Sequence, residues 1–111
     1  MVLLEMKLKK ILGSKTAALD DATERLKMAY VHTEHVAERL KANDLKGAEK
    51  AIRIEALLVA EANLDIGLFS SVYGTPDIAR KHLLIARDGF LEQKDHDIAA
   101  QITRYMSTLG L

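Results

Sequence analysis

The fold of this chain is decided by residues 60–91, which read AEANLDIGLFSSVYGTPDIARKHLLIARDGFL. Gly67, Ala79 and Ala86 are small residues at positions where paired helices approach closely, and Gly74 supplies a turn between them. A single hairpin of this kind cannot bury both of its apolar faces, so it needs further helices or a partner chain beside it. The stretch therefore predicts an interaction module, and it identifies no reaction.

The tripeptide Gly74-Thr75-Pro76 marks the boundary between two helices. Glycine can end the first helix, threonine can cap the second, and proline suits the first turn of the second. We expect the second helix to run from Pro76 to about Lys94, with four residues turned inward: Ala79, Leu83, Ala86 and Phe90. Residues 95–97 then open a last helix, which has one apolar face: Ile98, Ile102, Tyr105, Met106 and Leu109.

Upstream, apolar residues at alternating spacings of three and four predict a helix from about Thr16 to Ala42 that packs along another helix. These residues are Leu19, Ala22, Leu26, Ala29, Thr33, Val36 and Leu40. Asn43-Asp44 supplies a turn and the cap of the next helix, which begins near Leu45. Residues 51–69 are apolar on nearly all sides, which predicts a central element contacted from several directions. The pattern leaves open whether residues 45–73 form one helix or two; we favour one long helix, bent at Gly67.

Residues 1–13 predict a short amphipathic arm ahead of a single helical domain at residues 14–111. Its shared apolar face comprises Leu4, Leu8, Ile11 and Leu12. Three lysines lie inside and after the apolar run, unlike the charge order of a secretory signal. The arm is also far shorter than the roughly 20 residues of a membrane span. Packing on the domain or on a second subunit is favoured over docking on a membrane surface.

Composition sets the outer limits of function. Sixteen basic and sixteen acidic side chains cancel, so the electrostatic footprint of a nucleic-acid binder is missing. The chain has no cysteine, which fits a cytoplasmic location and excludes thiolate chemistry. At 111 residues the chain is close to the size at which oligomerisation often adds needed burial.

The order Ile66-Gly67, Gly74, Ala79, Leu83 and Ala86 is similar to one tetratricopeptide repeat, over about residues 60–94. The chain departs from that family's pattern at Asn63, Ser70 and Glu92. A second, upstream likeness rests on Asn43-Asp44 and Ala48, with Val36 and Glu55 at positions where the family has small residues.

The resemblance implies a non-enzymatic scaffold that presents helices to a peptide or protein. Too few repeats are present for a full groove, so self-association is expected, with a homodimer preferred. The residues expected to shape the hairpin are Ile66, Gly67, Tyr73, Ala79, Leu83 and Ala86. The alternative fold is an ordinary antiparallel helical bundle, and in either case the class is all-α.

The alternative function is a bundle that binds a metal or small ligand through His32, His35 and Glu38, which lie along adjacent turns of one helix. A histidine pair facing solvent or an interface is favoured, because neither histidine lies on the apolar seam and no histidine has a glutamate three residues before it. His82 is read as a hydrogen-bonded packing residue rather than a general base. We therefore expect no enzyme activity and no cofactor.

Overall fold

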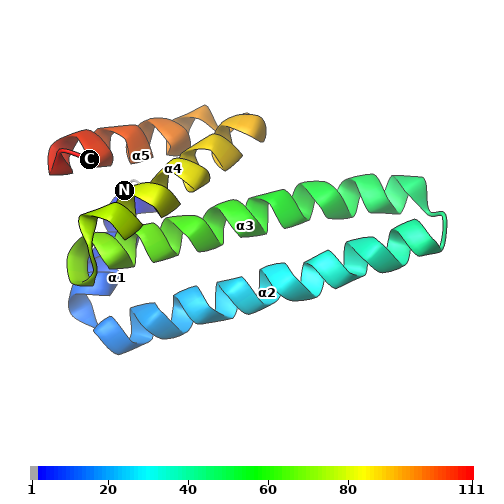
Figure 1. Cartoon of the computed structure of the whole chain (residues 1–111), viewed down its shortest axis with the longest axis horizontal. Coiled ribbons are helices and arrows are strands. Elements are labelled where there is room, and N and C mark those ends of the chain that lie inside the picture. Colours follow the sequence, from blue (N-terminus) through cyan, green and yellow to red (C-terminus); the bar gives the residue numbers. More distant parts are fainter. Residues whose placement is uncertain (1–2) are drawn as a thin grey trace.

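Five helices make up the part of the chain that the structure, a computed structural model, describes, residues 3–111 (Figure 1). They are α1 (Leu3–Gly13), α2 (Lys15–Lys41), α3 (Leu45–Tyr73), α4 (Pro76–Glu92) and α5 (His96–Leu109). No strand occurs within these residues. The helices pack against one another as a bundle, so the all-α prediction is confirmed.

Side-chain caps explain where the helices begin. Asp44 accepts a hydrogen bond from the Gly47 amide at 2.9 Å, and Thr75 and Asp95 cap α4 and α5 in the same way. The predicted starts at Leu45 and Pro76 are therefore confirmed. Helix α2 starts at Lys15, one residue earlier than predicted, because Ser14 is its cap.

Helix α4 ends at Glu92, two residues before the predicted Lys94. Lys94 adopts a left-handed backbone conformation, with a φ of 61°, which cannot continue a right-handed helix. Asn43 takes the same kind of conformation, with a φ of 58°, in the turn between α2 and α3. The left-handed backbone of Asn43 thus explains the turn that was predicted at Asn43-Asp44.

Helix α3 is a single uninterrupted helix of 29 residues, which settles the question that the sequence left open. Helices α1, α2 and α4 all pack against it, so it is the predicted central element. Within residues 3–111 it is also the one helix long and apolar enough, by length and composition alone, to cross a membrane. The core helix of a bundle meets the same criterion.

The core lies where α1, α3, α4 and α5 meet. Its fully buried large side chains are Leu64, Leu68, Leu83, Phe90 and Ile102. Leu4 and Ile11 bring α1 into this core, and Leu8 packs at its edge. Leu12, expected on the same face, is instead 69% exposed, because it follows the buried Ile11 and one residue turns an α-helix by about 100°.

The molecule is elongated, with extents of 46 × 28 × 27 Å. Figure 1 shows the cause: the hairpin of α2 and α3 projects well beyond the end of α4 and α5. Among the described helices, α2 packs only against α3 and α1. One end of the molecule is therefore a multi-helix core, and the other is a bare pair of helices.

Candidate protein-interaction surface

Small residues form the seam of the projecting hairpin. Helix α2 buries Ala22, Ala29 and Val36 there, and α3 buries Ala48 and Ala51. Short side chains let two helix backbones approach closely, but they remove little apolar area from water. The seam therefore leaves the larger side chains of both helices outside it.

The predicted seam of α2 is only half buried. Its members alternate between the buried residues just named and residues that the structure leaves exposed: Leu19, Leu26, Thr33 and Leu40. The expectation that all seven residues face one packed neighbour was wrong. One flanking helix can cover only part of a seam of this width, and in this part of the bundle α2 has α3 alone as a neighbour.

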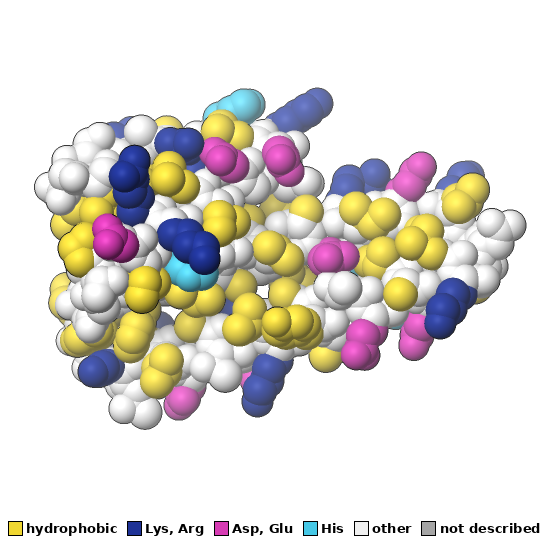
Figure 2. Space-filling view, viewed as in Figure 1, with side chains coloured by type: hydrophobic (Ala, Val, Ile, Leu, Met, Phe, Trp, Pro, Cys, Tyr) yellow, Lys and Arg dark blue, Asp and Glu magenta, His cyan; other side chains and the backbone are white. Residues whose placement is uncertain are grey.

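The exposed half of this seam belongs to a larger apolar surface, which we call the open face. It comprises Leu19, Leu26, Tyr30 and Leu40 of α2, Leu45, Ile52 and Val59 of α3, and Ile85 of α4. Helical spacing places these α2 and α3 residues on the same side of the hairpin, and Val59 and Ile85 line one shallow depression. Figure 2 shows hydrophobic side chains gathered along α2 and α3 on the face turned to the viewer, with α1 behind α3. Isolated exposed leucines are ordinary, whereas a group of large apolar side chains exposed on one side calls for an explanation.

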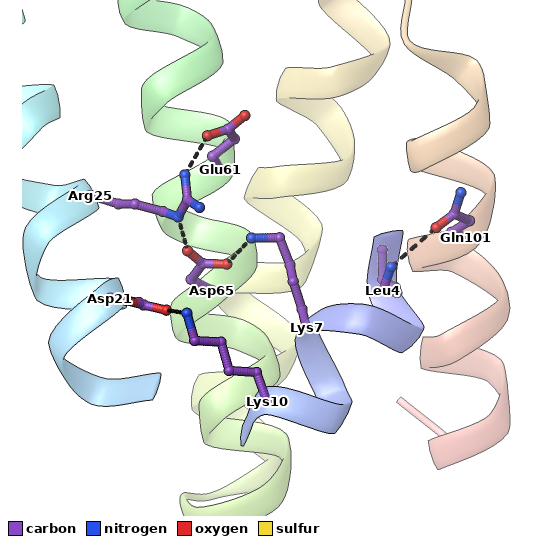
Figure 3. Close-up of polar contacts among 8 residues, drawn as sticks. All are labelled: Leu4, Lys7, Lys10, Asp21, Arg25, Glu61, Asp65 and Gln101. Carbon is purple, nitrogen blue, oxygen red and sulfur yellow. Dashed lines mark hydrogen bonds and ion pairs between the residues drawn. The ribbon is translucent and has the colours of Figure 1, made fainter. Parts of the chain in front are cut away.

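Helix α1 covers the opposite side of the hairpin at its base, and ion pairs hold it there (Figure 3). The Lys7 ammonium lies 2.6 Å from the Asp65 carboxylate, and Lys10 pairs with Asp21. Arg25 pairs with Asp65 at 2.5 Å and with Glu61 at 2.8 Å. The arm therefore packs on its own domain, which was one of the two placements favoured from the sequence.

Hydrogen bonds complete the attachment of α1 at both of its ends. The Leu4 amide lies in the first turn of α1 and has no acceptor within the helix. It donates instead to Oε1 of the buried Gln101 on α5 at 3.3 Å. The Tyr73 hydroxyl donates to the Ile11 carbonyl at 2.9 Å. Helix α1 thus joins α2, α3 and α5 into one unit.

A depression of about 230 Å³ lies between α1 and the base of the hairpin. Its charged lining consists of Lys7, Lys10, Asp21, Arg25 and Asp65, which pair with one another. The ion pair with Lys10 lowers the pKa of the Asp21 carboxyl, which keeps that pair charged well below neutral pH. Since each of these side chains is engaged in an ion pair, and Glu61 beside Arg25 balances the remaining positive charge, the depression is better explained as the attachment site of α1 than as a ligand site.

The predicted hairpin residues lie at the α3–α4 contact or near it. A methyl group at Gly67 would lie 2.8 Å from the Leu83 side chain and 3.1 Å from its amide nitrogen, so the helices touch closely there. Ala79, Leu83 and Ala86 are wholly buried, and Ile66 is half-buried. Tyr73 lies at the end of α3 and binds α1. Apart from Tyr73, which is 40% exposed, these residues present little surface to a partner.

The histidines do not form a metal site in the described residues. The rings of His32 and His35 are 5.7 Å apart, and His35 Nε2 accepts a hydrogen bond from Arg39. Within residues 3–111, no three histidine, aspartate or glutamate side chains lie close enough together to hold a metal ion, so the structure does not bring Glu38 to the histidine pair.

His82 packs on α3 through a hydrogen bond, as its sequence context indicated. The Asn63 amide donates to the Val59 carbonyl, so its Oδ1 is free to accept from His82 Nδ1 at 2.8 Å. Burial, with the nearby charge of Lys81, lowers the pKa of His82, so the ring stays neutral at physiological pH. No carboxylate in the described chain orients this ring, and an activated general base needs such a partner.

The α3 and α4 members of the open face were not predicted from the sequence. Leu45, Ile52, Val59 and Ile66 recur every seven residues, a period that could have separated one face of α3 from its apolar surroundings.

In comparisons with known proteins, no protein-family model matches the chain, and no curated protein or solved structure matches it either.

Proposed function

We propose that this chain is a non-enzymatic, helical protein–protein interaction module that associates with itself. The observation that carries the proposal is the open face: eight large apolar side chains, between 38% and 70% exposed, on one side of a projecting hairpin. An alanine-lined helix pair buries too little apolar surface to be stable alone, whereas two such pairs face to face make a four-helix bundle.

The likeness to a tetratricopeptide repeat supports the same class of function. The close contact of Gly67 with Leu83 and the burial of Ala79 and Ala86 are what such a hairpin requires. The hairpin of α3 and α4 is the repeat-like unit in this proposal, and the hairpin of α2 and α3 is the unit that associates.

Light scattering across a dilution series tests the proposal. We expect a metal-free dimer, or a larger assembly, that persists into the low micromolar range. A monomer at all concentrations would contradict self-association. Stoichiometric metal in the same sample would favour the alternative function through His32, His35 and Glu38.

A further inference from the structure

We infer that the open face docks on the open face of a second copy of this chain, with the two hairpins antiparallel and related by a two-fold axis. This inference rests on the proposed self-association and adds its geometry. In this arrangement α2 lies along the partner's α2, and α3 along the partner's α3. The axis passes near Thr33 on α2 and near Ala56 on α3.

The two axis positions lie at the same height along the hairpin. Thr33 Oγ1 donates to the Glu55 carboxylate at 3.1 Å, so residue 33 of α2 is level with residues 55 and 56 of α3. A two-fold axis perpendicular to the helices must cross both at one level. The small side chains of Thr33 and Ala56 let the two layers come close at that level.

Large side chains lie symmetrically about these positions, as an isologous interface requires. On α2, Leu26 and Leu40 are each seven residues from Thr33, so Leu26 meets the partner's Leu40 and Leu40 meets the partner's Leu26. Tyr30, which is 70% exposed and three residues before Thr33, is level with the partner's Val36 and lies next to the exposed, small Ala37 of the partner. On α3, Ile52 falls opposite the partner's Val59.

Charges at the rim of α2 are complementary in the same register. Pairing about Thr33 brings Lys27, six residues before it, to within one residue of the level of the partner's Glu38, which is five residues after it. Both side chains are exposed, and neither forms an ion pair within the described chain. Lys27 and Glu38 are about 16 Å apart along their own helix, at about 1.5 Å per residue, so they cannot pair within one chain.

The area is sufficient for a specific dimer. The hairpin between residues 26 and 59 is about 24 Å long and two helix diameters, about 20 Å, wide. The two subunits together then bury roughly 1,000 Å², the lower bound for a specific interface. Helix α1 lies on the other side of the hairpin and does not obstruct this approach.

Charge reversal provides the first test. Lys27→Glu or Glu38→Lys alone should raise the dissociation constant about tenfold at low salt, since each creates two like-charge pairs across the axis. The double variant Lys27→Glu/Glu38→Lys should return to the wild-type value. Two single effects that simply add in the double variant would overturn the register.

Single cysteines provide the second test, on a chain that has none of its own. Thr33→Cys and Ala56→Cys should each oxidise to a disulfide-linked dimer, because each residue lies beside its symmetry mate. Val31→Cys, on the outer side of α2 and 66% exposed, is the matched control and should stay reduced. A dimer by light scattering that leaves both axis cysteines reduced would overturn this arrangement while self-association stands; a monomer would overturn both proposals.

Discussion

At the scale of the residue, Gly67 shows how one missing side chain sets the distance between two helices. A methyl group there would lie 2.8 Å from two carbons of Leu83 and 3.1 Å from its backbone nitrogen. The leucine side chain could shift, but the backbone of α4 could move only by separating from α3. The predicted resemblance to a repeat motif included this glycine among several residues, and the close contact gives Gly67 a packing role in this bundle.

We therefore predict that Gly67→Leu lowers the free energy of unfolding by about 1–3 kcal/mol or more, the usual cost of overpacking a core. Gly67→Ala should be milder, since alanine recovers about 1 kcal/mol of helix propensity. Urea denaturation followed by circular dichroism measures both variants. Gly13→Ala is the control, because nothing lies within 4 Å of that position. Equal changes in the free energy of unfolding for Gly13→Ala and Gly67→Ala would show that helix propensity, rather than packing against Leu83, determines the effect.

At the scale of the element, α1 is attached by two ion pairs of very different burial. The Asp65 carboxylate is 11% exposed and faces two cations, Lys7 and Arg25. The Asp21 carboxylate is 45% exposed and faces Lys10. Solvent screens the second pair and not the first, so the two pairs should contribute unequally to the docking of α1.

Asp65→Asn should lower the stability by about 1–3 kcal/mol, because it leaves the largely buried Lys7 without its counter-charge and leaves Arg25 with Glu61 alone. Asp21→Asn should cost less than about 1 kcal/mol, as is usual for exposed pairs. Hydrogen exchange should show faster exchange of the α1 amides in Asp65→Asn than in the matched Asp21→Asn variant. Similar exchange in the two variants would mean that the apolar contacts of Leu4 and Ile11, rather than charge, attach α1.

Local signals in the sequence predicted the elements well. Asp44 and Thr75 were recognised as caps because their effect depends on residues within one turn. The half-exposed seam of α2 was not foreseen, because periodicity shows which residues share a face and not how many helices cover it. That number depends on the length of α4, which ends at Glu92 and leaves the far half of the hairpin bare.

At the scale of the whole molecule, the elongated shape separates two kinds of packing. The multi-helix end buries Leu64, Leu68 and Phe90 almost completely, whereas the hairpin end buries mainly alanines. The hairpin end is therefore the less stable part of a lone chain. If a second copy covers it, its stability depends on protein concentration.

The midpoint of thermal unfolding should accordingly rise with concentration. A hundredfold increase adds about 2.7 kcal/mol per dimer by mass action, and about 1 kcal/mol shifts the midpoint of a domain of this size by about 4 °C or more. We expect a rise of several degrees for the wild-type chain and none for Ile52→Glu, which places a charge in the centre of the open face. Met28→Glu adds the same charge on the opposite side of α2, where Met28 is 48% exposed, and should keep the wild-type dependence. Scanning calorimetry at two concentrations decides the matter: a wild-type midpoint that does not move would mean that the bare hairpin is stable without a partner.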